Sequence, residues 1–140
     1  LCGNNVQRTL VENAAITIAR LGKVNPHLVS PYLESFIQQW CLVMKGIRDN
    51  NEKASAFIGM LNIISVDPNP IVKQDSEGNY TVFLLFGSSI LNWRDIHPDL
   101  NNKFYEILNN FKTFLGVNWE LALKIWPPHL RDLLQSRYNL

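Results

Sequence analysis

The sequence predicts an all-α fold, an α-α superhelix in which pairs of helices stack side by side. The main observation is a repeat: residues 11–26 (VENAAITIARLGKVNP) recur 42 positions later as residues 53–68 (KASAFIGMLNIISVDP), with four identities. Both copies carry apolar residues at helical spacing and end in Asn-Pro or Asp-Pro. A repeat of roughly 40 to 47 residues built from two helices is typical of HEAT and armadillo solenoids.

A third, weaker copy extends the repeat. Three residues of the second copy recur 47 positions on, so that Phe57, Leu61 and Asn62 correspond to Phe104, Leu108 and Asn109. The five additional positions fit a polar loop at about 73–80, which we interpret as an insertion. Stacked helix pairs of this kind indicate a surface for partners rather than a reaction centre.

Composition supports a globular domain and argues against several classes of protein. Apolar residues make up 46% of the 140 positions and charged residues 18%, so the chain can bury a core. The net charge of +1 and the scattered Lys and Arg residues give no electrostatic footprint for nucleic acid. We therefore expect no direct nucleic-acid binding. No apolar stretch is long enough to cross a bilayer, so we also expect no membrane insertion.

The first predicted helix spans about 5–22. Its apolar positions follow helical spacing and are expected to face the core: Val6, Leu10, Ala14, Ile18 and Leu21. Gly22, followed by Asn25-Pro26, is expected to end this helix.

A helix pair is predicted at about 27–67. Its first helix should start at Ser30-Pro31, with Ser30 as N-cap and Pro31 in the first turn. Its second helix should be capped by Asp49, because Glu52 follows three residues later in capping-box spacing. This pair forms one complete repeat.

The next repeat is predicted at about 80–115, after the polar loop at 73–80. Its first helix, about 80–93, is the least distinct element, because residues 81–83 (Thr-Val-Phe) also suit a strand. Its second helix is expected to begin at Pro98 or Asp99 and to end at Leu115, before a glycine.

The C-terminal part, about 118–140, departs from the repeat and is predicted to be a cap. Two short helices, about 119–125 and 129–137, are separated by Pro127-Pro128. A terminal repeat of a solenoid is commonly atypical because it must close the core. The chain begins at Leu1, and its first helix has no predecessor to pack against, so we expect a fragment of a longer array.

Residues that carry chemistry are sparse. None of His27, His97 and His129 has another His or a Cys at helical spacing, and nucleotide-binding and hydrolase motifs are absent. We therefore predict that the protein is not an enzyme and needs no cofactor or metal. Cys2 and Cys41 leave two alternatives, a disulfide or two buried free thiols, and their apolar helical surroundings favour the thiols.

One row of the first helix differs from a core face. Thr9, Asn13, Ile16 and Arg20 follow steps of 4, 3 and 4, which place them on one side of the helix. A hydroxyl, an amide, a branched aliphatic group and a cation suit an extended peptide, whose backbone an Asn can bind. The alternative interpretation is a solvated helix face with one exposed Ile.

Several segments resemble the C-terminal end of the transportins, which are nuclear import receptors of the karyopherin-beta family. The matching segments occur in order over nearly the whole chain: LVENAAITIARLG (10–22), FIQQWC (36–41), IRDNNEKASAFIGM (47–60), ISVDP (64–68), FYEILNNFK (104–112) and NW (118–119). The resemblance implies the last two or so HEAT repeats of such a receptor.

The same resemblance implies a function. The family binds proline-tyrosine-type nuclear localisation signals of cargo proteins on a concave C-terminal arch, and Ran-GTP on the N-terminal arch releases them. It also implies contacts with nuclear pore proteins and shuttling between cytoplasm and nucleus. The Ran site and most cargo sites would lie outside this chain, whereas family cargo contacts on the first helix fall here on Thr9, Asn13 and Ile16.

Two features depart from the family. Residues 73–80 look like an insertion, and the chain is close to neutral although the family's cargo surface is strongly acidic. The alternative function is a HEAT-repeat scaffold that assembles proteins without nucleotide-controlled release. We also expect the first helix to expose apolar surface through which the fragment self-associates.

Overall fold

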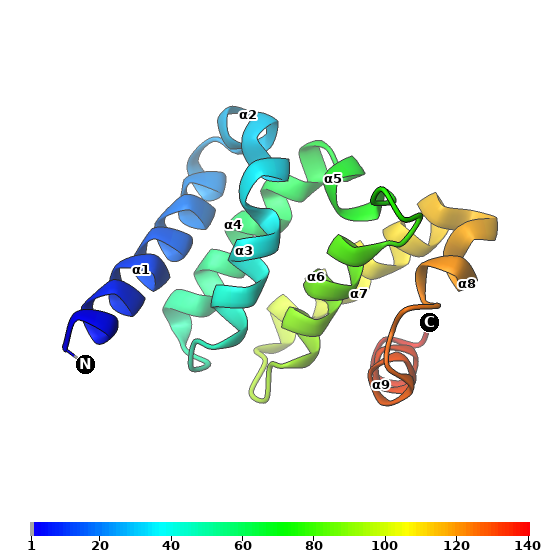
Figure 1. Cartoon of the computed structure of the whole chain (residues 1–140). Coiled ribbons are helices and arrows are strands. Elements are labelled where there is room, and N and C mark those ends of the chain that lie inside the picture. The colour runs from blue at the N-terminus through cyan, green and yellow to red at the C-terminus, as the bar shows by residue number, and fades with distance from the viewer. Residues whose placement is uncertain (1) are drawn as a thin grey trace. The chain divides into compact units, whose positions relative to one another are not determined.

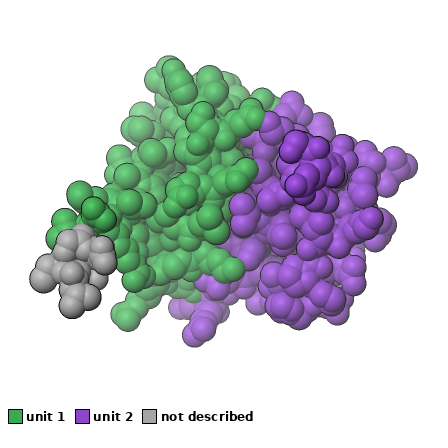
Figure 2. Space-filling view, in the orientation of Figure 1, with its two compact units in different colours: residues 1–67 green, residues 68–140 purple. Residues whose placement is uncertain are grey.

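The protein is all-α, as predicted. The structure is a computed structural model that describes residues 2–140, with side chains from residue 6 onward. Helices account for 79% of the chain, and no strand occurs among the described residues. The chain divides into two compact units, residues 1–67 and 68–140, coloured green and purple in Figure 2.

The first unit consists of three long helices and two short ones. They are α1 (Cys2–Val24), α2 (Pro26–Val29), the 3₁₀-helix η1 (Ser30–Tyr32), α3 (Leu33–Lys45) and α4 (Asn51–Val66). Figure 1 shows α1 and α3 joined by the α2 turn, and α1 packs along α4 more extensively than along any other helix of the unit.

The contact between α1 and α4 is unusually close because glycines form it. A Cβ atom on Gly59 would overlap the backbone carbonyl of Ala19, and one on Gly22 would overlap the carbonyl of Gly59 and lie 2.6 Å from Ile63 Cγ1. Ala15 and Ala19 are buried beside this contact. Small residues therefore let the two backbones meet directly, without intervening side chains.

This packing corrects the prediction that Gly22 ends the first helix. The helix continues to Val24, and Gly22 lies inside it against α4. Pro26 then opens α2 in a first-turn position, so helical structure resumes before the predicted start at Ser30. A glycine near a helix end can serve as a stop or as a contact point, and only packing distinguishes the two.

The predicted core face of the first helix is also wrong. Val6, Leu10 and Leu21 are exposed, whereas Ala15 and Ala19 are buried. The reason is that α1 approaches α4 most closely at Ala19 and Gly22, where larger side chains would not allow the two backbones to meet. The larger apolar side chains are left on an outer face.

The side chain of Trp40 on α3 contacts both α1 and α4 in the first unit. Its indole Nε1 donates a hydrogen bond to the carbonyl of Ala15 on α1, at 3.0 Å. Its ring meets Phe57 of α4 edge-on, with centroids 4.9 Å apart. Cys41, the next residue, is buried, and the side chain of Cys2 lies outside the described residues, so the choice between thiols and a disulfide stays a prediction.

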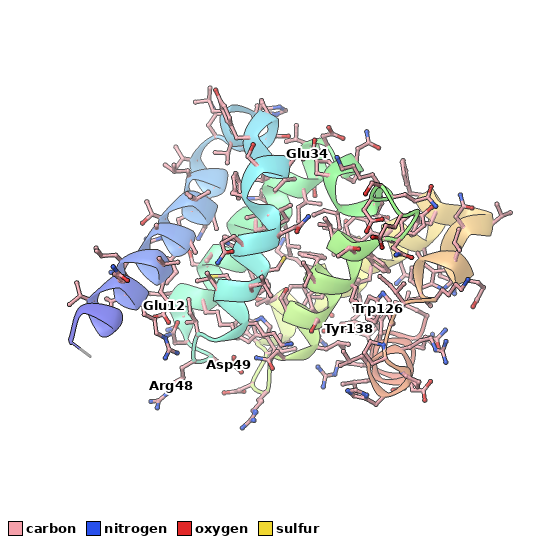
Figure 3. All side chains as sticks on the ribbon, in the orientation of Figure 1. Glu12, Glu34, Arg48, Asp49, Trp126 and Tyr138 are labelled. Carbon is pink, nitrogen blue, oxygen red and sulfur yellow. The ribbon has the colours of Figure 1, made fainter. Side chains whose placement is uncertain are left out.

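A buried lysine, Lys53, stabilises the turn between α3 and α4. Asn50, not the predicted Asp49, is the N-cap of α4, and its side chain accepts a hydrogen bond from the Lys53 amide at 2.8 Å. Asp49, labelled in Figure 3, instead accepts a 2.8 Å bond from Lys53 Nζ, which also donates to the Ile47 carbonyl at 3.0 Å. The fully buried ammonium is thus paired and hydrogen-bonded, as burial of a charge requires.

The second unit holds the remaining helices. They are α5 (Asn69–Val72), α6 (Thr81–Leu91), α7 (Pro98–Leu115), the 3₁₀-helix η2 (Gly116–Asn118), α8 (Trp119–Ala122) and α9 (Pro128–Tyr138). The predicted helix over 98–115 is confirmed at both ends. The ambiguous segment at 81–83 is helical, because Val82 and Phe83 pack into the core of this unit.

Aromatic rings dominate the core of the second unit. Phe83 of α6 contacts Phe111, Trp119 and Trp126, with centroids 5.2 to 6.1 Å apart. The Trp126 ring lies directly on Gly87, where a Cβ atom would overlap it. The segment predicted as a cap at 118–140 thus supplies two of the rings that fill this core.

The α9 helix is held by two tyrosines. Tyr138, labelled in Figure 3, is fully buried, and its hydroxyl donates to Asn101 Oδ1 of α7 at 2.9 Å. Tyr105 of α7 donates to the Arg137 carbonyl at 2.6 Å, and the two rings meet edge-on. Burial raises the pKa of Tyr138 to about 12, because it disfavours the phenolate.

The polar loop at 73–80 lies between α5 and α6 and is organised by Asp75. The Asp75 carboxylate accepts hydrogen bonds from Thr81 Oγ1 at 2.6 Å, from the Asn79 amide at 3.0 Å and from the Glu77 amide at 2.9 Å. The bond from Thr81, followed by that from Asn79, lowers the pKa of Asp75. This carboxylate links the loop to the first turn of α6, and the interpretation of the loop as an insertion stays a prediction.

Replacing Gly59 by Ala should lower the free energy of unfolding by about 1 to 3 kcal/mol, because the new methyl group must displace the α1 backbone. This loss should exceed the roughly 0.5–1 kcal/mol that Ala gains over Gly in a helix. Urea unfolding monitored by circular dichroism measures the change. Gly46→Ala is the matched control, because its Cβ would meet only the Val43 carbonyl, at 3.6 Å. A Gly59→Ala protein as stable as the parent would contradict the close contact.

Stability should fall at high pH through Tyr138. Its folded-state pKa of about 12 lies above the unfolded value of about 10, so its contribution is intact below pH 10 and is lost between pH 10 and 12. The loss attributable to this group should be about 2 to 3 kcal/mol. Urea unfolding between pH 9 and 12 measures it. Tyr138→Phe should flatten this part of the pH profile, and an unchanged slope in the variant would refute the assignment.

Candidate binding surface

The predicted row on α1 separates into an exposed part and a buried part. Thr9, Asn13 and Arg20 are exposed on the helix surface. Ile16 is only 9% exposed and belongs to the core of the first unit. The structure therefore brings three polar side chains together on one side of α1 and turns most of the fourth residue inward.

The burial of Ile16 corrects the expectation of an exposed Ile. Ile16 precedes Ala19 by three residues, so both lie toward the same side of the helix. Because α4 approaches α1 closely at Ala19, it covers this side of the helix and buries Ile16 as well. A role of Ile16 in signal binding stays a prediction. Its buried position suits packing beneath the exposed row better than direct contact with a peptide.

A second row on α4 was missed by the sequence reasoning. The 42-residue repeat places Asn51, Ser55, Ile58 and Asn62 at the positions of Thr9, Asn13, Ile16 and Arg20. Asn51 and Asn62 are exposed, and Ser55 and Ile58 are half-buried. The repeat itself was the signal that could have revealed this row, because equivalent positions on stacked helices point in equivalent directions.

The two rows adjoin. Lys23, near the end of α1, donates a hydrogen bond from Nζ to Ser55 Oγ on α4, at 3.0 Å. We call Thr9, Asn13, Arg20, Lys23, Ser55 and Asn62 the polar face of the first unit. It offers hydroxyl, amide and cationic groups, which can bind the carbonyl and amide groups of an extended peptide.

The opposite side of α1 faces α3 and is apolar. A cavity of about 150 Å³ lies between the two helices, open on one side. Its lining combines aliphatic and aromatic side chains with one amide: Val11, Ala14, Ala15, Ile18, Phe36, Gln39, Trp40 and Val43. This cavity suits an apolar side chain, whereas the polar face suits a peptide backbone.

Two features are absent from the part of the chain that the structure describes. No group of three or more His, Cys, Asp or Glu side chains among these residues could hold a metal ion. None of the described helices is both long and apolar enough to span a membrane.

Helix pairs repeated along an all-α chain define a helical-repeat protein. No family model matches the sequence. Curated relatives do: the chain is 38% identical over 137 residues to Transportin-1 of Mus musculus and 34% identical over 136 residues to Transportin of Dictyostelium discoideum, covering 97% of this chain in both comparisons. It is 49% identical over 134 residues, or 94% of its length, to Importin subunit beta-2 of Schizosaccharomyces pombe.

These similarities cover nearly the whole chain, and the chain belongs to the transportin family. The predicted resemblance is thereby confirmed. The chain spans only 13 to 14% of the length of the relatives it matches. Most of what a whole transportin contains therefore has no counterpart in these residues.

Ile16→Ala should lower the free energy of unfolding by about 2 to 5 kcal/mol, because it removes a buried side chain. Asn13→Ala, three residues earlier on the exposed row, should change it by no more than about 0.5 kcal/mol. Urea unfolding of the two variants in parallel gives the comparison. Equal and small losses would show that Ile16 is not part of the core.

Proposed function

We propose that this chain is part of a nuclear import receptor that binds nuclear localisation signals of cargo proteins. The observation that carries the proposal is the similarity to proteins named transportin and importin over nearly the whole chain. The exposure of Thr9 and Asn13 supports it, because the resemblance implies cargo contacts at these two positions and both are open to solvent. Binding rather than catalysis is the activity.

The polar face is the proposed contact for the signal. The amides of Asn13 and Asn62 each offer donors and an acceptor, which match the alternating groups of an extended peptide backbone. Backbone contacts tolerate many side chains, so this face suits a variable part of a signal. Lys23 and Ser55 already bind each other, so a peptide has to share or replace their 3.0 Å bond.

Charge sets a further expectation for this contact. Arg20 and Lys23 carry positive charge on the polar face, and both are exposed. A signal segment that carries carboxylates or no charge at this point would be favoured over a basic one. Exposed charges contribute modestly and are screened by salt, so the preference should weaken as ionic strength rises.

In this proposal, the release of cargo and the movement between cytoplasm and nucleus depend on the rest of the receptor. Ran-GTP would act on repeats outside this chain, and contacts with nuclear pore proteins and shuttling between cytoplasm and nucleus would be properties of the whole receptor. A scaffold without nucleotide-controlled release is the competing function. A pull-down of the full-length protein with Ran-GTP separates the two, since a scaffold would not bind it.

In the full-length receptor, the double variant Asn13→Ala, Asn62→Ala should weaken binding of a cargo signal about 5- to 30-fold, or about 1 to 2 kcal/mol. Isothermal titration calorimetry with a cargo-signal peptide measures the dissociation constant. Asn110→Ala, an exposed amide on α7, is the matched control and should leave it unchanged. Identical affinity for the double variant and the parent would remove the polar face from the signal-binding surface.

A further inference from the structure

The third copy of the repeat, 47 positions after the second, carries the row of α4 onto α7. Asn109 occupies the position of Asn62, and Tyr105 occupies the position of Ile58. The two amides are exposed, and the two larger side chains are half-buried. A helix of the second unit therefore presents polar and large side chains in the same order as the helix of the first unit.

Four side chains form a patch on one side of α7. They stand at helical spacing, i, i+3, i+4 and i+7, so each is a neighbour of the others on the helix surface: Asn102, Tyr105, Glu106 and Asn109. We call these four residues the α7 patch. Tyr105 is half-buried, and the other three are exposed. The patch thus combines two amides, a carboxylate and an aromatic ring.

The ring of Tyr105 is held in place by α9. Its hydroxyl donates a hydrogen bond to the carbonyl of Arg137 at 2.6 Å, and its ring meets that of Tyr138 edge-on, with centroids 4.9 Å apart. Because Tyr105 is only half-buried, part of the side chain is open to solvent. A ring fixed in advance loses little conformational freedom when a ligand packs on it, and Tyr is enriched among binding hot spots.

The two amides of the α7 patch suit a peptide backbone. Each has two N–H donors and one acceptor oxygen. Asn109 donates one N–H to the Tyr105 carbonyl at 2.8 Å, which fixes the amide beside the ring and leaves the second N–H and the oxygen for a ligand. Asn102 stands on the other side of the ring along the helix, so a segment that crosses Tyr105 lies within reach of both amides.

Charge on this part of α7 favours a cation. Between Asp99 and Asn109 the helix carries two carboxylates, on Asp99 and Glu106, against the single ammonium of Lys103, so the net charge is −1. An arginine side chain can pack its planar guanidinium on an aromatic ring and donate hydrogen bonds to a carboxylate at the same time. The polar face of the first unit carries two cations instead and has the opposite preference.

We propose that the α7 patch is a second peptide subsite, which binds an extended segment through an arginine side chain. The arginine packs on Tyr105 and donates to the carboxylate of Glu106, while Asn102 and Asn109 bind the backbone on either side of it. This inference rests on the proposed function, because the segment belongs to the same cargo signal. A signal that uses both surfaces therefore carries a neutral or acidic segment for the polar face and a basic segment for the α7 patch.

Calorimetry on the full-length receptor tests this subsite. The probes are a cargo-signal peptide that contains arginines and a series of the same peptide in which each arginine in turn is replaced by glutamine. The receptor variants are the double variant Asn102→Ala, Asn109→Ala and the single variant Glu106→Gln. Asn110→Ala, an exposed amide of α7 outside the patch, is the matched control, and all the altered side chains are exposed, so folding should be unaffected.

The double variant should bind the parent peptide about 5- to 20-fold more weakly, and Glu106→Gln about 2- to 5-fold more weakly, with the smaller effect fading at high salt. One peptide of the series should lose the same factor against the parent receptor and should no longer distinguish Glu106→Gln from the parent. Such non-additivity is the mark of two groups in direct contact. Asn110→Ala should change no affinity.

A parent receptor that binds the peptide, together with a double variant of equal affinity, would overturn the α7 patch and leave the proposed function intact. Equal sensitivity of every peptide in the series to Glu106→Gln would also overturn it, because no arginine would then contact the carboxylate. A parent receptor that binds neither the signal peptide nor Ran-GTP would overturn the proposed function, and this subsite with it.

Discussion

The direct backbone contact between α1 and α4 is the constraint on which the rest of the first unit depends. Gly59 meets the carbonyl of Ala19, and Gly22 meets the carbonyl of Gly59, so the rotation of α1 about its own axis is fixed within narrow limits. Any other rotation would bring a side chain into a space that holds none. The hydrogen bond from Trp40 to Ala15 then holds α3 against the helix in that orientation.

That rotation assigns a role to each side of α1. The small residues face α4, Val11 and Ile18 face the cavity beside α3, and Thr9 and Asn13 face solvent on the polar face. The large apolar residues Leu10, Leu21 and Val24 remain exposed. One helix thus has a side that packs in its own unit, a polar side open to solvent and an apolar side open to solvent.

The repeat connects the binding surface with the architecture. Because α1 and α4 carry equivalent rows, a polar face built on one helix continues on the next, as Ser55 and Asn62 show. A peptide that binds such a surface gains contacts from each helix it crosses, and affinity accumulates over many repeats.

The sequence by itself determined the fold class, the repeat period, the helix over 98–115 and the family, because periodicity and ordered similarity are properties of the chain alone. Only the tertiary structure decided which side of α1 is buried. Hydropathy ranks Leu10 and Leu21 above Ala15 and Ala19 as core residues, yet the close helix contact selects the smaller pair. The same contact buried Ile16 and left Asn13 exposed, and it turned Gly22 from an expected helix stop into a packing point. Steric fit between two backbones, which depends on both helices at once, outweighed the apolar pattern of either one.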